Sequence, residues 1–145
     1  MVDSLVKSLQ KIISGTVTDQ HEILKFYSVD SSSFVKQPKL VVIPENIDDV
    51  KKTVKFSIKR KIPIAARGGS TGLVGSSLTN GIVIDMRNFN KIKLAKNHVV
   101  VGAGTSKGEL DKFLGTHKKF FGANPSVGAY CKIGGMIATN ASGTK

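Results

Sequence analysis

Tryptophan is absent from this chain, cysteine occurs once, and only 10 acidic residues stand against 22 lysines and arginines. The single cysteine, Cys131, cannot form an intramolecular disulfide, which excludes a disulfide scaffold and makes a reducing cytoplasm the expected location. No apolar run approaches the roughly 20 residues of a membrane-spanning helix, and the amino terminus lacks a signal-peptide core. With 145 residues, 40% of them hydrophobic, the chain suits one globular domain or two small lobes that share a core.

The shortage of acidic residues leaves a formal net charge of +12, which is compatible with a nucleic acid or an anionic surface as partner. The lysines are dispersed, however, and those at positions 51, 52, 55 and 59 punctuate one expected helix. Neither an arginine-rich stripe nor interleaved aromatic residues of the kind that stack on bases occur. We therefore expect a solvated basic surface, and a nucleic-acid-binding domain is only the third hypothesis.

Glycine, in contrast, is concentrated in the stretch 67–75, where Gly68, Gly69, Gly72 and Gly75 follow Arg67. Apolar strands are expected on both sides of this loop, at 62–66 and 81–86. Because no helix follows the glycines, the loop matches neither a Rossmann fingerprint nor a Walker loop. Glycine lets a ligand approach the main chain, so successive N–H groups can converge on a diphosphate. The alternative is a flexible glycine turn.

Hydrophobic periodicity and turn residues divide the rest of the chain into short elements. We expect helices at about 5–13, 19–26, 47–58 and 106–114, and further strands at 39–43, 92–95, 99–101 and 120–121. In the third helix, capped by Asn46 or Asp48, the residues expected to face the core are Ile47, Val50, Val54 and Ile58. Residues 40–67 form a predicted βαβ unit with parallel strands. Ser106 and Glu109 have the spacing of a capping box.

A second region rich in small residues, 125–143, closes the chain. Such residues can pack a helix against a flat ligand or, equally, against another helix. Three pieces, in this order, resemble the FAD-binding domain of the vanillyl-alcohol-oxidase superfamily, the p-cresol-methylhydroxylase type: Pro63–Gly75, Val101–Gly104, and Asn124–Ser126 with Ile133–Gly143. Within this superfamily the chain is most similar to the group of glycolate oxidase GlcD-like proteins and D-lactate dehydrogenases, which residues 27–34 and 44–50 also resemble.

The resemblance runs from about Tyr27 to Lys145 and implies an α+β fold in which FAD extends between two small lobes. We expect an N-terminal helical segment at 1–35 and a partial FAD-binding domain at 36–145. The latter comprises a parallel lobe at about 36–86 and the start of a second lobe at about 87–145. Relatives continue with the rest of the flavin lobe and a substrate domain, so the domain is expected to be incomplete at its carboxyl end.

The resemblance also assigns cofactor contacts to two groups of residues. The pyrophosphate falls to the first loop, with its flanking residues: Arg67, Gly68, Gly69, Ser70, Thr71, Gly72 and Leu73. The remaining contacts fall to Gly104, Pro125, Ser126, Ile133, Gly134 and Gly135, with Thr139, Asn140 and Ser142 near the flavin. Relatives have a third glycine where Ser70 stands, and a left-handed backbone conformation there would strain a serine. Substitution of Gly69 or Gly72 by valine is expected to weaken FAD binding while leaving the fold largely intact.

The function implied is the FAD-binding portion of a flavin-dependent 2-hydroxy-acid dehydrogenase or oxidase of the glycolate or D-lactate type. No catalytic or metal-ligating residue is assigned, because His21, His98 and His117 are scattered and expected at the surface or in turns. The first loop lacks a histidine, and Cys131 lies too close to Gly134 for the cysteine-tethered pattern, so FAD is expected to be non-covalent.

The chain alone is expected to be inactive. Its expected partners are FAD and the missing carboxyl-terminal half or a companion subunit, with self-association as a further possibility. The second hypothesis is a non-catalytic flavin-binding subunit, or a gene remnant, that assembles with another chain.

Overall fold

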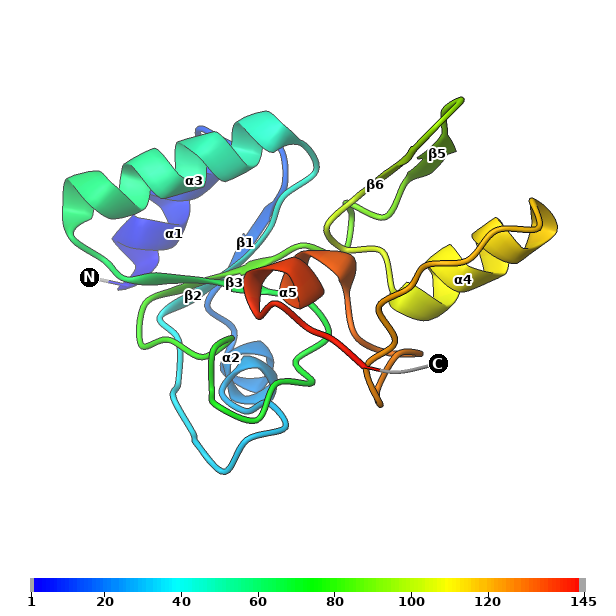
Figure 1. Ribbon diagram of the computed structural model, residues 1–145. Coiled ribbons are helices and arrows are strands. Elements are labelled where there is room, and N and C mark those ends of the chain that lie inside the picture. Colours follow the sequence, from blue (N-terminus) through cyan, green and yellow to red (C-terminus); the bar gives the residue numbers. More distant parts are fainter. Residues whose placement is uncertain (1, 144–145) are drawn as a thin grey trace.

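Two sheets organise the chain, one in each of two lobes (Figure 1). The computed structural model describes residues 2–143, with side chains from residue 5 onward. In chain order the elements are α1 (Val2–Gln10), β1 (Thr16–Thr18), α2 (His21–Tyr27), β2 (Leu40–Ile43), α3 (Ile47–Arg60), β3 (Ile64–Arg67), β4 (Ile82–Asp85), β5 (Ile92–Leu94), β6 (Val99–Val101), α4 (Lys107–Thr116) and α5 (Ile133–Ala138). The two-lobed arrangement expected from the sequence is confirmed.

The first sheet has the strand order β1-β2-β4-β3. Strands β2, β4 and β3 run parallel, as predicted for the βαβ unit, but β4 lies between the two strands of that unit. The chain therefore leaves β3 through the glycine loop and returns to the gap beside β2. Strand β1, which the sequence did not predict, pairs antiparallel with β2 over residues 16–18. A strand of three residues is too short to show the alternation of apolar and polar side chains, so β1 is recognised only by its pairing with β2.

Both faces of this sheet are covered, which explains why β2 is wholly apolar and why β4 is apolar up to its last residue, Asp85. Because side chains alternate along a strand, Leu40, Val42, Ile82 and Ile84 pack with Leu9 of α1 on one face. On the other face Val41 and Val83 pack with Leu24 and Tyr27 of α2. Figure 1 shows α1 and α3 on one side of the sheet and α2 on the other.

The inner face of α3 differs from the prediction. Ile47 and Ile58 are 62% and 71% exposed, whereas the side chains of Asp49, Thr53 and Ser57 are buried. These three polar residues recur every four positions and so share one helix face. Each of these side chains makes a hydrogen bond, which offsets the cost of removing a polar group from water. The prediction was wrong for Ile47 and Ile58, whereas Val50 is half-buried and Val54 packs against the core of the first sheet, as predicted.

Asp49 connects α3 to the turn after α1. Its Oδ1 accepts a hydrogen bond from the Ser14 amide, and its Oδ2 accepts from the amides of Gly15 and Glu45, at 2.9 to 3.0 Å. Burial alone would raise the pKa of this carboxyl, but the three backbone donors lower the pKa below its ordinary value. Asn46 caps the same helix by accepting from the Asp49 amide, which confirms one of the two predicted caps.

The second lobe contains the antiparallel hairpin β5–β6 and helix α4, both predicted. The capping box between Ser106 and Glu109 is present. A cluster of buried side chains joins α4 to α5: Leu110, Leu114, Cys131, Ile133 and Met136. The strand predicted at 120–121 is absent from this part of the described chain, because Phe121 packs against that cluster while Phe120 is 72% exposed.

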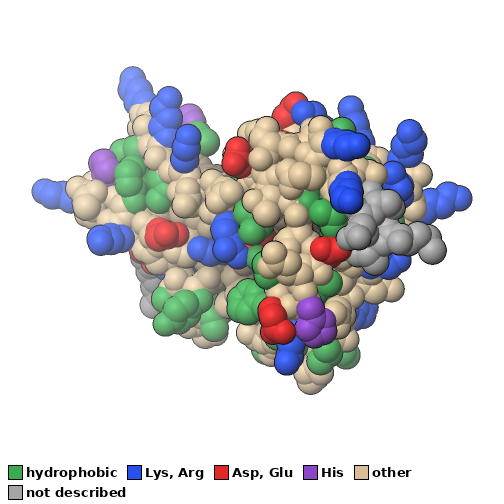
Figure 2. Space-filling view, turned by 180° about the vertical axis from the view of Figure 1, so that it is seen from behind, with side chains coloured by type: hydrophobic (Ala, Val, Ile, Leu, Met, Phe, Trp, Pro, Cys, Tyr) green, Lys and Arg blue, Asp and Glu red, His purple; other side chains and the backbone are tan. Residues whose placement is uncertain are grey.

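Within residues 2–143, no helix is long and apolar enough to cross a membrane. In the same range no three histidine, cysteine or acidic side chains gather as a metal site would require. Lysine and arginine side chains stand singly or in small groups around the rim of the face drawn in Figure 2, separated by neutral surface. This distribution agrees with the expected solvated basic surface.

Candidate functional site

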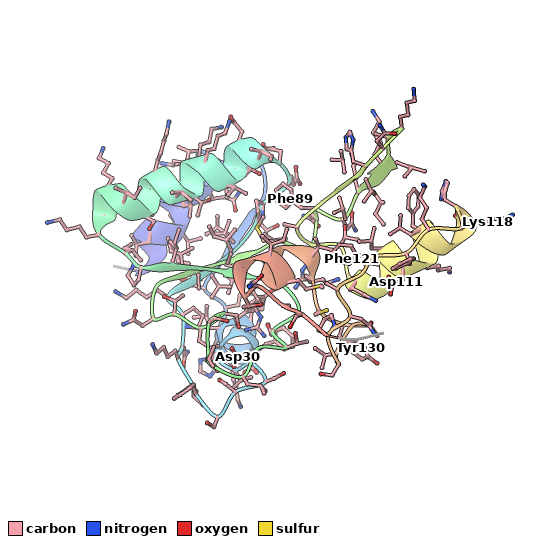
Figure 3. The ribbon with its side chains drawn as sticks, viewed as in Figure 1. Asp30, Phe89, Asp111, Lys118, Phe121 and Tyr130 are labelled. Carbon is pink, nitrogen blue, oxygen red and sulfur yellow. The ribbon has the colours of Figure 1, made fainter. Side chains whose placement is uncertain are left out.

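A cleft of about 410 Å³ lies where the two glycine-rich regions meet. A Cβ atom added to Gly69 would lie 2.5 Å from the Tyr130 carbonyl oxygen, so the two backbones are in contact there. The remaining motif, Val101–Gly104, joins this contact because its Ala103 carbonyl accepts a hydrogen bond from the Gly134 amide at 2.9 Å. Figure 3 shows Tyr130 on the segment that leads from α4 to α5. Three pieces far apart in sequence thus build one site.

The first wall of the cleft is the loop that follows β3, and a second segment holds that loop from behind. The amide and hydroxyl of Ser31 both donate to the Ser70 carbonyl at 3.0 Å. Ser77 donates its hydroxyl to Asp30 Oδ2 at 2.9 Å. Burial alone would raise the pKa of Asp30, but hydrogen bonds from Ser32 and Ser77 lower it, so this carboxylate stays ionised. The loop is held through a carbonyl and a serine side chain, which leaves its amides uncommitted.

Within the described chain, the backbone N–H groups of residues 68–72 donate no hydrogen bond to a protein acceptor. Adjacent free donors on a loop that lines a cleft form an anion-binding concavity. Ser70 adopts the left-handed backbone conformation that strains a serine, with φ of 55°. Its Oγ is buried and has no partner there. A strained residue with an unsatisfied hydroxyl at the cleft is typical of a binding loop.

Arg67, which the resemblance places beside the pyrophosphate loop, is absent from the cleft lining within the described residues. Its side chain is 6% exposed and lies near the rings of Phe26 and Tyr27, with Cζ 5.6 and 4.8 Å from their centroids. Its Nη1 donates to the carbonyls of Tyr27 and Val29. The guanidinium is therefore outside the cleft lining and ties α2 and the following segment to the base of the loop.

Beneath the loop, Tyr27, Asp85 and Arg87 form a polar network between α2 and the end of β4. The Tyr27 hydroxyl donates to Asp85 Oδ2 at 2.5 Å, and Arg87 donates to the same carboxylate oxygen at 2.7 Å. Burial and the Asp85 carboxylate together raise the pKa of Tyr27 to about 12. Burial would raise the pKa of Asp85, but the hydrogen bonds from Arg87 and Tyr27 lower it. The phenol thus stays neutral and the carboxylate charged.

The opposite wall is α5. The glycines in and near this helix differ in how much space an added Cβ atom would have. A Cβ on Gly134 would lie 2.8 Å from that of Ala103, and one on Gly104 would lie 1.9 Å from the Met86 carbonyl oxygen. These two glycines permit backbone packing. Gly135, in contrast, lines the cleft and has nothing within 4 Å of an added Cβ. It leaves room for a flat group against the helix.

Eight of the predicted residues line the cleft: Gly68, Gly69, Ser70, Thr71, Gly72, Pro125, Gly135 and Thr139. The others lie elsewhere. Arg67 and Ile133 are buried, Leu73 is 75% exposed, and Asn140 and Ser142 are exposed after the end of α5. Gly104 and Gly134 are packing contacts, and Ser126 lines a neighbouring cleft of about 610 Å³.

Nine residues that were not predicted also line the cleft: Ala66, Ser76, Ser77, Val127, Cys131, Lys132, Met136, Ala138 and Ala141. Helical spacing could have identified Lys132 and Met136, because they share the i, i+3, i+4, i+7 pattern of one helix face with the predicted Gly135 and Thr139. Cys131 is 6% exposed, and burial raises the pKa of its thiol. The thiol is therefore a packed side chain of low reactivity. The three histidines are exposed, as predicted.

Comparison with known proteins gives a consistent picture. The family model described as an FAD binding domain matches residues 38–145. The chain is 33% identical over 136 residues to a D-2-hydroxyglutarate dehydrogenase of Pseudomonas putida, covering 89% of this chain and 14% of that protein. It is 32% identical to a mitochondrial D-lactate dehydrogenase (cytochrome) of Arabidopsis thaliana, covering 97% of this chain and 26% of the relative. Glycolate oxidase subunit GlcD of Escherichia coli is 28% identical, with 97% and 30% covered.

Solved structures agree on the fold. An alkyldihydroxyacetonephosphate synthase superposes with a TM-score of 0.83 at 22% identity, covering 97% of this chain and 30% of the other. A p-cresol methylhydroxylase superposes with a TM-score of 0.76 at 17% identity, covering 93% and 28%. The chain therefore spans less than a third of the length of each of these relatives.

Proposed function

Because the chain belongs to the FAD-binding domain family of the p-cresol-methylhydroxylase type, we propose that its cleft binds FAD and serves a 2-hydroxy-acid dehydrogenase or oxidase. In this proposal the chain is the FAD-binding portion of such an enzyme, of the D-lactate or glycolate type. The similarity to relatives that carry those names supports the substrate class.

The observation that carries the proposal is the row of uncommitted amides from Gly68 to Gly72 on one wall of the cleft. A diphosphate presents several acceptor oxygens and negative charge, which such a row of donors can satisfy without a helix dipole. Gly135 on the other wall leaves space for a planar ring system. The donors and the open wall together fit FAD in its extended form.

When bound, FAD would supply the hydride-accepting chemistry that no amino acid side chain offers. The chain's own residues would bind and orient it: loop amides at the diphosphate, and Met136 and Ala138 as apolar cover that excludes water. The described lining of the cleft includes neither a histidine nor a carboxylate. We therefore propose that the base acting on the substrate hydroxyl belongs to further polypeptide, either covalently continuous or a companion subunit.

Titration of FAD into the purified chain, followed by flavin fluorescence or the visible spectrum, tests the proposal. Gly72→Val should weaken binding by more than tenfold, or over about 1.4 kcal/mol, because its side chain would stand among the free amides. The nearest neighbour of an added Cβ is Ser76 Oγ at 3.4 Å, so the fold should persist. Unchanged affinity would contradict a diphosphate on this loop.

A matched pair of helical glycines provides the control. Gly135 in α5 and Gly115 in α4 both have open space beside them, but only Gly135 lines the cleft. Alanine at either position should stabilise its helix by about 0.5 to 1 kcal/mol. Only Gly135→Ala should weaken FAD binding, because its methyl group would occupy space reserved for the cofactor. Equal effects of the two variants would contradict the proposed ring position.

The same lining also supports a second candidate, a non-catalytic flavin-binding subunit. Both proposals require FAD binding and differ only in turnover. Mixing the chain with the polypeptide encoded next to it, then assaying 2-hydroxy acids, separates them. Activity on mixing would support the enzyme portion, and bound flavin without activity would support the subunit.

A further inference from the structure

Lys132 is the one charged side chain among the residues that line the cleft in the described chain. It directly precedes α5 and faces the first loop: a Cβ added to Gly68 would lie 3.1 Å from the Lys132 Cβ. A β-bridge to Ser106 and the hydrogen bond that the Ile133 amide donates to the Thr105 carbonyl fix the backbone on both sides. The base of this side chain is therefore held against the loop, while the side chain as a whole is 27% exposed.

The Lys132 ammonium has only a weak partner. Its Nζ lies 3.9 Å from Glu109 Oε2, which is beyond hydrogen-bonding distance. That carboxylate oxygen already accepts from the amide and the hydroxyl of Ser106, both at 2.7 Å, in the capping box of α4. Glu109 is 56% exposed, so the attraction across this gap is screened by water. The ammonium can leave Glu109 at little cost.

The neighbouring cations are committed. Lys107 is 3% exposed, and its ammonium is bonded to Asp111 and to Asn124. The Arg67 guanidinium is bonded to the carbonyls of Tyr27 and Val29 on the far side of the loop. Neither charge can turn toward the cleft without breaking these hydrogen bonds. Positive charge at the cleft thus comes from Lys132.

We infer that Lys132 turns away from Glu109 and pairs with the diphosphate of FAD from the wall opposite the glycine loop. This inference rests on the proposed function and deepens it. The loop amides supply directed donors, and Lys132 supplies the compensating charge that neutral amides lack. A charge-assisted hydrogen bond in a partly enclosed cleft is stronger than a neutral one. Glu109 and the diphosphate compete for the same ammonium.

The competition gives two substitutions opposite effects. Lys132→Met keeps the aliphatic stem and removes the charge, so FAD should bind at least about tenfold more weakly. Glu109→Gln keeps the capping-box acceptor and removes the competing charge, so FAD should bind about twofold to threefold more tightly. Riboflavin has the ring and ribityl chain without phosphate, so its affinity should be unchanged in both variants.

The experiment measures dissociation constants of the whole chain for FAD and riboflavin at low and high sodium chloride. Lys132→Met should also reduce the salt dependence of FAD binding. Lys93→Met, which removes an exposed lysine from β5 and lowers the net charge equally, is the control and should match the unmodified chain. Where riboflavin binds too weakly to measure, the salt dependence and the Glu109→Gln result decide.

The outcomes are distinct. Unchanged FAD affinity in Lys132→Met, or an equal loss for FAD and riboflavin, would overturn the inference while leaving FAD binding intact. Weaker FAD binding in Glu109→Gln would overturn the competition. Failure of the unmodified chain to bind FAD at all would contradict the proposed function itself, and the inference with it.

Discussion

Gly69 and Gly72 differ in how much room the structure leaves for a side chain. Gly69 was expected to tolerate a side chain without loss of the fold, but a Cβ there would meet the Tyr130 carbonyl oxygen at 2.5 Å. Valine at this position must therefore displace the second glycine-rich region, so Gly69→Val reports on packing as well as on binding. Gly72 has no such neighbour and is the better probe of the loop.

Tyr27 carries a pH dependence that can be measured directly. Its pKa in the fold is about 12 against an ordinary value of 10.0, because burial and Asp85 favour the neutral phenol. The stability that it contributes is fully present below pH 10 and is lost as the pH rises toward 12. The chain has two tyrosines and no tryptophan, so tyrosinate absorbance resolves this group.

Titration of the unmodified chain should show one tyrosine that ionises only near pH 12. Tyr27→Phe should lack this late step, and Tyr130→Phe should retain it. A late step that survives in Tyr27→Phe would show that another group is responsible. Complete ionisation of both tyrosines well below pH 12 would contradict the Tyr27–Asp85 hydrogen bond.

Cys131 bears on how a flavin would be held. Its thiol lines the cleft, but it is 6% exposed and burial raises its pKa, so little thiolate exists for attachment. We predict that acid precipitation of the flavin-loaded chain releases all the colour into the supernatant. Flavin retained on a peptide that contains Cys131 would contradict non-covalent binding.

At the level of elements, the loop after β3 and helix α5 are held in place by other segments. The loop is held by Ser31 and Ser77, and α5 by hydrogen bonds from its first two amides to the Thr105 and Ala103 carbonyls. Helix α3 contributes no residue to the cleft lining and packs against the core of the first sheet through Val54 and Phe56. Local stability at α3 can therefore be changed without altering the cleft.

Asp49→Asn should lower the free energy of unfolding by about 2 to 4 kcal/mol, because an amide can accept at one oxygen only and leaves buried backbone donors unsatisfied. Asp48→Asn, one residue earlier in the same turn, is the control. Its side chain is 69% exposed and lies 3.6 Å from Lys52, so its loss should cost less than about 1 kcal/mol. Urea unfolding measures both, and similar losses would argue against the Asp49 contacts.

The pH dependence of this pair gives a second check on the same element. The lowered pKa of Asp49 means that its contribution is present above the ordinary carboxyl range and is lost as the pH falls through the pKa in the fold. The difference in stability between the unmodified chain and Asp49→Asn should therefore shrink at acid pH. A difference that is independent of pH would show that the charge is not involved.

At the scale of the whole molecule, both lobes contribute walls to the cleft, but its described lining offers no general base. Oxidation of a 2-hydroxy acid needs a base within hydrogen-bond reach of the substrate hydroxyl and cations that fix its carboxylate. We predict that the 145-residue chain with added FAD reduces no dye in the presence of D-lactate, glycolate or related acids. Substantial turnover by the chain alone would contradict the proposed division of labour.

The sequence by itself determined the features that depend on neighbours a few residues apart. The capping box at Ser106, the hairpin at 92–101 and the absence of a helix after the glycines all follow from local patterns. The glycine loop was likewise visible as a candidate anion site, because glycine acts on its own backbone. The three ordered motifs also indicated the family, which the matching family model confirms over residues 38–145.

Only the tertiary structure decided which residues of those motifs face the cleft. Gly104 and Gly134 are packing residues because Met86 and Ala103 lie against them, and no pattern within the motifs contains those contacts. Asp49 of α3 can be buried because the distant amides of Ser14 and Gly15 donate to its carboxylate. Lys132 became a candidate when folding placed it opposite Gly68, 64 positions earlier in the chain (132 − 68). Local patterns specify elements, whereas a site depends on contacts between residues that are far apart in sequence.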